Sequence, residues 1–160
     1  EITGGSGGDT IKGMGGSDIL RGGSGVDLIT GGTGSDNIGG GGGADKFIFA
    51  SGDTSTVVSE ETITDFTTGS DKLDFGEATN DATIVDGAGL VLSTFKSAAD
   101  AFFTNGDMDV YIAYNVSGLN DALVAVDHNK DGIYNTGDTL IKLSNIETET
   151  DILTSDIQTY

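Results

Sequence analysis

The strongest constraint on the fold is a nine-residue period that keeps four columns of the sequence in phase between residues 4 and 48. Two columns are glycine: Gly4, Gly13, Gly22, Gly31 and Gly40, and Gly7, Gly16, Gly25, Gly34 and Gly43. One column is aspartate (Asp9, Asp18, Asp27, Asp36 and Asp45), and two places after each aspartate comes a large apolar residue (Ile11, Leu20, Ile29, Ile38 and Phe47). A flexible linker has no reason to hold such a phase. The spacing therefore predicts a repeat architecture of stacked units.

The residue types in these columns are suited to a hard cation. Glycine lets the chain turn sharply and point its carbonyls at one spot, and aspartate adds carboxylate oxygens. Calcium takes about six to eight such oxygens. The chain has no cysteine and one histidine, so it lacks the sulfur and nitrogen ligands that zinc and copper prefer. Magnesium demands tight octahedral geometry and keeps its waters. The sequence therefore predicts calcium (Ca2+) as the cofactor.

The pattern G-G-x-G-x-D-x-U-x resembles the calcium-binding nonapeptide of RTX proteins. That resemblance implies an all-β fold in which residues 1–50 form a right-handed, calcium-filled parallel β-roll. Each triplet centred on the apolar residue is expected to form a short strand with that side chain pointing inward. Stacked turns are expected to share ions between Asp9 and Asp27, Asp18 and Asp36, and Asp27 and Asp45, with glycine carbonyls completing each shell. Met14 replaces a glycine of the second repeat, so its turn is expected to be strained.

The repeats are not expected to fold without metal. Ordering each residue costs ~1–2 kcal/mol, whereas the single inward side chain of each repeat returns ~1.5–3 kcal/mol. The chain also carries 26 acidic against 7 basic side chains, a formal net charge of -19. Such a chain repels itself unless cations lie among its carboxylates, and nucleic acid is an unfavourable partner for it. No apolar run reaches the ~18 residues of a membrane span.

From residue 51 to residue 160 the composition becomes that of an ordinary globular domain, and a β-rich capping region with one short helix is expected. Residues 47–50 are predicted to be the last strand of the roll. Further strands are predicted over residues 62–66, 71–75, 82–85, 90–95, 110–114, 122–127 and 139–143. A helix is predicted over residues 97–104, capped by Ser97. Its apolar stripe of Ala98, Ala101 and Phe102 is expected to pack against the roll.

The strings ADKFIFASGD and ETITDFTTGSDKLDFGE resemble the segment that closes the β-roll in serralysin-type proteases, RTX lipases and bacterial surface-layer proteins. The resemblance implies that Asp65, in the I-x-D-F motif, binds the last calcium beside Asp36, with help from Asp71 or Asp74. The alternative is that these acids face water between strands.

A second candidate calcium site lies in residues 127–138. Asp127, Asn129, Asp131 and Asp138 occupy positions 1, 3, 5 and 12 of an EF-hand spacing, with Gly132 at position 6. Position 12 is Asp instead of the longer Glu, and the flanking segments are predicted strands. The alternative is a polar turn between strands. His128 is expected to be an exposed loop residue.

No catalytic residues and no enzymatic activity are predicted. One histidine leaves no Ser–His or Cys–His pair, and the zinc motif H-E-x-x-H is absent. Because the chain begins at Glu1 without a leader, it is expected to be a mature portion or a C-terminal fragment.

The RTX resemblance implies type I export, with a secretion signal in the last ~60 residues, and folding outside the cell at calcium of ~10⁻⁴–10⁻³ M. The alternating residues 141–160 fit this signal loosely, although the ending SDIQTY departs from the family tail. The expected partners are calcium ions, the type I machinery and other copies in a surface lattice. The leading interpretation is a secretion and folding module of a bacterial surface-layer or adhesin protein. The alternatives are the same module on a secreted protease or lipase, and a structural spacer or ligand-binding module with no secretion role.

Overall fold

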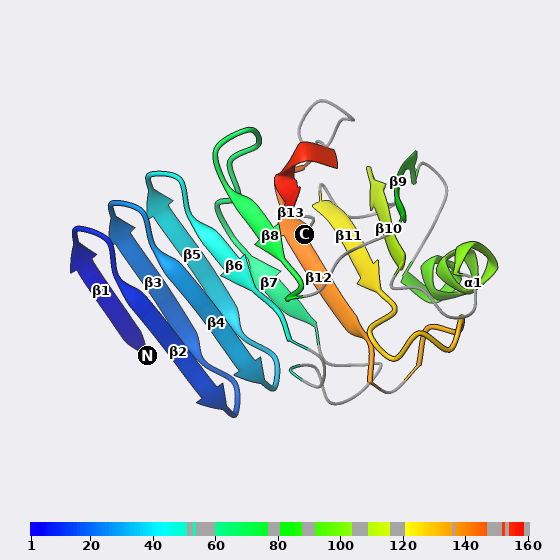
Figure 1. Cartoon of the computed structure of the whole chain (residues 1–160), viewed down its shortest axis with the longest axis horizontal. Helices are drawn as coiled ribbons and strands as arrows, with labels where there is room; N and C mark the ends of the chain where they lie inside the picture. Colours follow the sequence, from blue (N-terminus) through cyan, green and yellow to red (C-terminus); the bar gives the residue numbers. More distant parts are fainter. Residues whose placement is uncertain are drawn as a thin grey trace.

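The computed structural model describes residues 1–50, 53, 60–76, 81–87, 92–103, 109–115, 121–135, 137–146, 152 and 154–158. The described residues form two sheets, one helix and a short 3-10 turn (Figure 1). The strands of the roll are β1 (Ile2–Ser6), β2 (Thr10–Gly15), β3 (Ile19–Ser24), β4 (Leu28–Thr33), β5 (Asn37–Gly42), β6 (Lys46–Ile48), β7 (Glu61–Ile63) and β8 (Lys72–Asp74). The cap contains β9 (Asp81–Asp86), α1 (Leu92–Phe102), β10 (Asp109–Tyr114), β11 (Asp121–Val126), β12 (Thr139–Ser144), η2 (Thr154–Asp156) and β13 (Ile157–Gln158).

Successive strands of the roll alternate between the two sheets, so each nine-residue repeat carries the chain across the core once. The strands β1, β3 and β5 pair in parallel in one sheet, and β2, β4 and β6 pair in parallel in the other. Leu20 lies opposite Ile38 in the first sheet, and Ile29 lies opposite Phe47 in the second. Both pairs are two repeats apart, which confirms the parallel β-roll predicted from the period.

The interior of the roll is a ladder of single large apolar side chains. Leu20, Ile29, Ile38 and Phe47 are all fully buried, and Ile11 is 3% exposed. A thin core of this kind is the consequence of placing one inward apolar residue in each repeat. Burial contributes about 1.5–3 kcal/mol per side chain, so the turns need a separate source of stability.

The roll continues past the nonapeptides, and the prediction that residues 47–50 form its last strand is wrong. After an insertion, β7 pairs with β5 so that Ile63 lies opposite Ile38. In the other sheet β8 pairs with β6, and Leu73 lies opposite Phe47. Ile63 and Leu73 are fully buried and extend both apolar ladders. The inward apolar position thus returns even though the nine-residue phase has been lost.

The cap is a continuation of the first sheet. Parallel to β7 lies β12, followed by β11, β10 and β9, so the sheet runs β1-β3-β5-β7-β12-β11-β10-β9. The predicted strands over 82–85, 110–114, 122–127 and 139–143 are confirmed to within one residue at each end. At the C-terminus β13 adds to the second sheet, with Ile157 opposite Leu73.

Helix α1 covers the cap sheet at the end far from β1 (Figure 1). The predicted strand over residues 90–95 is wrong where the structure describes it, because residues 92–95 begin this helix. The helix buries Phe95 and Ala99, and Phe103, directly after its last residue, continues the four-residue spacing, whereas Ala101 is exposed. Its buried face packs with Tyr111 and neighbouring side chains of the cap. The expectation that it packs against the roll is therefore wrong.

Among the helices that the structure describes, none has the length and hydropathy needed to cross a lipid bilayer.

Candidate metal centre

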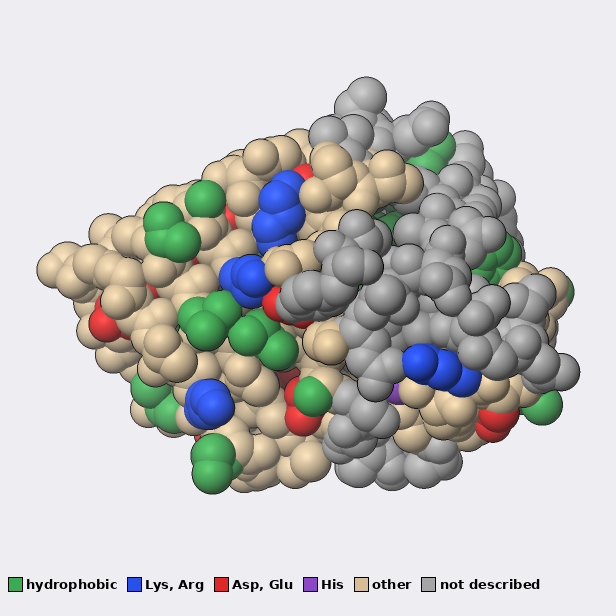
Figure 2. Space-filling model, viewed as in Figure 1, with side chains coloured by type: hydrophobic (Ala, Val, Ile, Leu, Met, Phe, Trp, Pro, Cys, Tyr) green, Lys and Arg blue, Asp and Glu red, His purple; other side chains and the backbone are tan. Residues whose placement is uncertain are grey.

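The acidic residues of the roll form two rows along its turns. The first turn row lies between the odd strands and the even strands that follow them and contains Asp9, Asp27, Asp45 and Asp71. The second turn row lies on the opposite edge and contains Asp18, Asp36 and Glu61. Most of these acids are buried, which is why few acidic side chains colour the face of the roll in Figure 2 despite the strongly negative chain.

Within each row, one carboxylate oxygen is held by the backbone of the previous coil. Oδ1 of Asp27 accepts a hydrogen bond of 2.8 Å from the N–H of Asp9, and Oδ1 of Asp45 accepts one of 2.9 Å from the N–H of Asp27. In the second turn row, Oδ1 of Asp36 accepts from the N–H of Asp18 at 2.7 Å. The structure thus brings together the three aspartate pairs that the sequence predicted. The N–H of the previous coil fixes one oxygen of each of these carboxylates.

The second oxygen of these carboxylates is buried and has no hydrogen-bond partner. This holds for Oδ2 of Asp9, Asp27, Asp36 and Asp45 and for Oε1 of Glu61. A buried polar atom without a partner costs about 1–3 kcal/mol, and a charged one costs more. The repetition of this arrangement in successive coils indicates that something other than protein completes it.

The unpartnered Oδ2 atoms of the four aspartates face the first glycine of the same repeat, and at Gly4 and Gly22 a carbonyl of the next coil arrives as well. A Cβ placed on Gly4 would lie 2.6 Å from Oδ2 of Asp9 and 2.6 Å from the carbonyl oxygen of Gly22. At Gly13 the carbonyl oxygen of Gly31 would be 2.5 Å away and Oδ2 of Asp18 3.0 Å away. These positions accept no side chain, and they gather carboxylate and carbonyl oxygens, the ligands that calcium prefers. The residues therefore fit calcium.

The electrostatics of the rows also require a counter-charge. Burial raises the pKa of Asp36, Asp45 and Asp71, and neighbouring carboxylates raise it further. Burial, with the charge of Asp36, raises the pKa of Glu61 to about 8. None of the ion pairs found among the described residues includes an acid of either row. A divalent cation would neutralise these carboxylates where no lysine or arginine does so.

Side chains alone do not build a metal site among the described residues of the roll. Within the described part of the chain, no group of three His, Cys, Asp or Glu side chains is placed to hold a metal. An ion in the turns would therefore draw most of its ligands from backbone carbonyls. Such a shell suits calcium, whose coordination is flexible.

Met14 departs from the glycine pattern and carries the strain that the sequence predicted. Its φ is 80°, in the region that glycine occupies at the equivalent Gly23 and Gly32 with φ of 115° and 95°. The Met14 side chain points into solvent and is 73% exposed. The strain is local to one turn, and the roll keeps its register on both sides, with Ile11 opposite Ile29.

Asp65 lies at the end of the first turn row, so the expectation that it sits beside Asp36 is wrong. Because Ile63 pairs with Ile38, Asp65 comes alongside Gly40 two residues later. Its oxygens accept hydrogen bonds from the N–H groups of Gly40 at 2.9 Å and Gly41 at 3.0 Å. Its carboxylate is exposed, and its charge acts on Asp45 and Asp71.

The two acids expected to assist Asp65 differ in position. Asp71 belongs to the first turn row: its Oδ1 accepts from the N–H of Asp45 at 2.9 Å. Asp74 lies outside both rows, because its Oδ2 is 3.3 Å from Nζ of Lys46 and its Oδ1 accepts from the N–H of Gly76.

Glu61 takes the place beside Asp36 and was missed in the sequence. Its Oε2 accepts a hydrogen bond of 3.2 Å from the N–H of Asp36. A search restricted to aspartate in a nine-residue phase excludes Glu61. The signal that could have found it is the spacing acid-x-apolar, which links Glu61 to Ile63 and Asp71 to Leu73 as it links Asp9 to Ile11.

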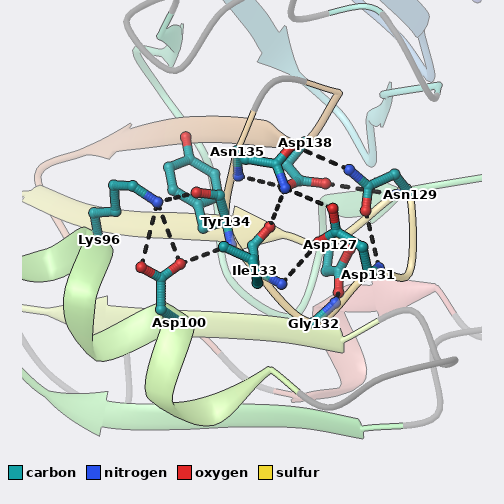
Figure 3. A network of polar contacts seen from close by, with 10 residues as sticks. All are labelled: Lys96, Asp100, Asp127, Asn129, Asp131, Gly132, Ile133, Tyr134, Asn135 and Asp138. Carbon is teal, nitrogen blue, oxygen red and sulfur yellow. Dashed lines mark hydrogen bonds and ion pairs between the residues drawn. The ribbon is translucent and has the colours of Figure 1, made fainter.

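The loop of residues 127–138 uses its carboxylates to bind its own backbone (Figure 3). Asp127 accepts from the N–H groups of Lys130 at 2.7 Å and Gly132 at 2.9 Å. Asp138 accepts from the N–H groups of Asn135 at 2.7 Å and His128 at 3.1 Å. These hydrogen bonds are those of a tight polar turn, and they satisfy both carboxylates from within the loop.

The remaining candidate ligands of this loop are more exposed. Asn129 Oδ1 accepts from the N–H of Asp131 at 2.9 Å, and Asp131 Oδ1 accepts from the N–H of Ile133 at 2.8 Å. Burial raises the pKa of Asp127 and raises that of Asp138 to about 6. All four side chains lie in one loop and bind its backbone, and calcium binding by residues 127–138 stays a prediction.

His128 is buried, contrary to expectation. It is 7% exposed, and its ring packs edge-on against Phe75 with the centroids 6.1 Å apart. His128 follows β11 of the cap closely, and Phe75 follows β8 of the roll. Their contact lies at the seam, the place where roll and cap meet, so this side chain points inward.

Comparison with known families agrees with the geometry of the roll. Residues 3–38 and 21–55 match the family model of the RTX calcium-binding nonapeptide repeat, which describes four copies of the motif. No curated protein matches the chain. The segment 3–55 therefore consists of RTX repeats, and the chain contains a calcium-binding β-roll module. Repeats of this family are typical of secreted bacterial proteins.

Proposed function

We propose that this RTX-repeat chain is a folding and secretion module, which folds on binding calcium outside the cell and carries the type I secretion signal of a bacterial surface-layer or adhesin protein. The observation that carries the calcium part is the series of buried carboxylate oxygens without partners, repeated at Asp9, Asp27, Asp36 and Asp45. Each faces a glycine of its own repeat. At Gly4 and Gly22 a Cβ placed on the glycine would also meet the carbonyl oxygen of the next coil.

The proposed ions would be held by chain oxygens on both edges of the roll. Asp9, Asp27 and Asp45 would hold them on one edge, and Asp18 and Asp36 on the other, each with glycine carbonyls of its own and the next coil. The bound ion supplies positive charge that the rows lack. Because the stacked turns exist only in the folded state, the free energy of ion binding becomes free energy of folding.

Calcium dependence would couple folding to location. At the low calcium of the cytosol the acidic turns repel one another, so the chain stays extended and can be threaded through a secretion channel. At extracellular calcium of about 10⁻⁴–10⁻³ M the ions fill the turns and the roll folds. The absence of cysteine and proline supports this, since neither disulfide formation nor slow prolyl isomerisation would delay folding.

The C-terminal part of the chain supports a signal that is read before folding. In the folded protein, β12 and β13 are incorporated into the two sheets. A secretion apparatus that recognised residues 141–160 would therefore meet them in the unfolded chain. The proposed host is a surface-layer or adhesin protein because the chain is rich in Thr, Ala, Gly and Asp, as such proteins are. Its role there is binding and assembly, not catalysis.

Two measurements test this proposal. Far-ultraviolet circular dichroism of chelated protein should show a disordered roll that gains β structure as calcium is added, whereas equal magnesium leaves it disordered. An identical spectrum with and without calcium would refute calcium-dependent folding. For the secretion part, a passenger fused to this chain should be exported through a type I apparatus, and removal of residues 141–160 should stop export. Unchanged export of the truncated fusion would refute the signal.

Lattice formation is tested by small-angle scattering. Calcium should convert monomers into sheets or filaments at high protein concentration. A calcium-loaded protein that stays strictly monomeric would contradict a surface-layer host and would favour a secreted protease or lipase.

A further inference from the structure

We infer that Glu61, which lies outside the nonapeptide repeats, is a calcium ligand that closes a site with Asp36 and Gly31 at the seam between roll and cap. The inference rests on the proposed function, because it assumes that the turn rows bind calcium. It adds a site whose acid comes from the strand that follows the insertion.

An oxygen of Glu61 lies close to Gly31. At Gly4 and Gly13 a Cβ would meet Oδ2 of the aspartate of the same repeat and a glycine carbonyl of the next coil. At Gly31 a Cβ would lie 2.5 Å from Oδ2 of Asp36, and its other oxygen neighbour is Oε2 of Glu61 at 3.2 Å. The chain has left the glycine pattern at this coil. Glu61 thus brings Oε2, which also accepts from the N–H of Asp36, to the place where the earlier coils bring a carbonyl, and its Oε1 is left without a partner.

Glu61 and Asp36 are buried, and each has a carboxylate oxygen without a partner. Glu61 is 1% exposed and Asp36 is 2% exposed, so both carboxylates are removed from water. Oε1 of Glu61 and Oδ2 of Asp36 are buried and have no hydrogen-bond partner. Two buried carboxylates that raise each other's energy and lack a lysine or arginine are costly. A divalent cation between them would satisfy both.

Glu61 also occupies the position of a row aspartate. Its Oε2 accepts from the N–H of Asp36 at 3.2 Å, as the Oδ1 atoms of the row aspartates accept from the preceding coil at 2.7–2.9 Å. The backbone of β7 comes as close as that of a repeat coil, since the N–H of Thr62 donates to the carbonyl of Asp36 at 2.9 Å. Glu61 is therefore held in the second turn row as the aspartates are.

The position of Glu61 gives the site a consequence beyond the roll. Glu61 begins β7, which pairs with β5 of the roll on one side and with β12 of the cap on the other. In the second pairing Glu61 itself lies opposite Ile141. An ion held by Glu61 and Asp36 would therefore fix the strand that both parts share. The order of the cap should depend on calcium through this residue.

The chain contains a natural probe for this dependence. All four tyrosines (Tyr111, Tyr114, Tyr134 and Tyr160) follow the seam in the sequence, and the chain has no tryptophan. Tyrosine circular dichroism in the near ultraviolet therefore reports on the cap, while far-ultraviolet signals are dominated by all the strands. The two signals are recorded on the same chelated protein during a calcium titration.

The decisive variant is Glu61→Gln, with Glu60→Gln as its matched control. Glu60 is the adjacent residue of the same type, and its carboxylate pairs with Lys142 on the partly exposed surface. We expect Glu61→Gln to bind one calcium ion fewer by calorimetry and to need at least about tenfold more calcium for the tyrosine signal. Glu60→Gln should match the parent chain in both measurements. In calcium, the melting temperature of Glu61→Gln should fall.

If the inference is wrong, Glu61→Gln should change the melting temperature in the opposite direction. If Glu61 is simply a buried acid, Glu61→Gln removes an unsatisfied charge, so the calcium count stays the same and the melting temperature in calcium rises. That result overturns the inference while leaving the proposed function intact. A parent chain that binds no calcium would instead overturn the proposed function itself.

A second variant covers the case in which Glu61→Gln does not fold. Glu61→Asp keeps the carboxylate but withdraws it by one methylene, so it should fold with a calcium midpoint for the tyrosine signal raised above that of the parent. A Glu61→Asp protein with an unchanged midpoint would overturn the inference.

Discussion

Replacing Met14 by glycine should stabilise the protein, although the substitution removes a large side chain. Met14 has a φ of 80°, and it occupies a column in which Gly5, Gly23, Gly32 and Gly41 all have positive φ. Its side chain is 73% exposed, so few packing contacts are lost with it. The change therefore acts on the backbone conformation of one turn.

The expected magnitude follows from two opposing contributions. A residue with a Cβ pays about 1–2 kcal/mol to adopt the left-handed conformation. Glycine adds about 0.5–1 kcal/mol to the entropy cost of ordering the chain. The difference is a stabilisation of about 0.5–1 kcal/mol, which corresponds to a rise in melting temperature of roughly 1–4 °C for a chain of this size.

The assay is thermal unfolding in saturating calcium, followed by far-ultraviolet circular dichroism. Met14→Ala is the matched control, because it removes the same exposed side chain but keeps the Cβ, and it should lie within about 0.5 kcal/mol of the parent. Val26→Gly is a second control at a position that is 65% exposed and has no positive φ, and it should destabilise. If Met14→Gly melts at or below the temperature of Met14→Ala, the reasoning from backbone strain is wrong.

Three further predictions test other parts of the structure. Ile29→Ala removes a fully buried side chain of the apolar ladder and should lower the free energy of unfolding in urea by about 2–5 kcal/mol with calcium present. The neighbouring Thr30→Ala should lower it much less, and equal effects would contradict the ladder. In the absence of calcium, protons should partly replace the missing ions: the pKa of Glu61 is raised from 4.5 to about 8 in the folded state, so any folded population should be largest near pH 4.5 and should be lost as the pH rises to about 8. Far-ultraviolet circular dichroism that gains β structure as the pH rises over this window would contradict the burial of that acid. Asp156→Asn should release β13, because the buried carboxylate of Asp156 accepts hydrogen bonds from Thr68, Gly69 and Lys72. Hydrogen exchange at the amide of Ile157 should accelerate. Unchanged protection would show that this carboxylate does not hold β13.

The roll could be predicted from the sequence because its structural repeat appears directly as a nine-residue spacing along the chain. Each Asp and the apolar residue two places later specify a turn and an inward side chain, so stacking follows from spacing alone. The same signal persists weakly after the insertion, as Glu61 with Ile63 and Asp71 with Leu73. The nine-residue period of the repeats is interrupted there, so the sequence places the segments that form β7 and β8 in the cap.

The cap could be predicted only in part, because its elements are set by tertiary packing. Residues 92–95 were assigned to a strand from their apolar character, yet Phe95 belongs to a helical stripe with Ala99 and Phe103. The position of Asp65 depends on the register of Ile63 against Ile38, which a long insertion leaves undetermined in the sequence. The pairing of β13 with β8 joins residues more than eighty positions apart, as in the contact of Asp156 with Gly69. No local sequence pattern predicts such a pairing.

The measurement that tests the central claim most directly is anomalous diffraction from calcium-loaded crystals. Density for an ion is predicted between successive coils on both turn rows, within about 2.3–2.6 Å of Oδ2 of Asp27, Asp36 and Asp45 and of facing glycine carbonyls. An ordered roll with no ion density in the turns, in which water or a protein group satisfies those oxygens, would contradict the account.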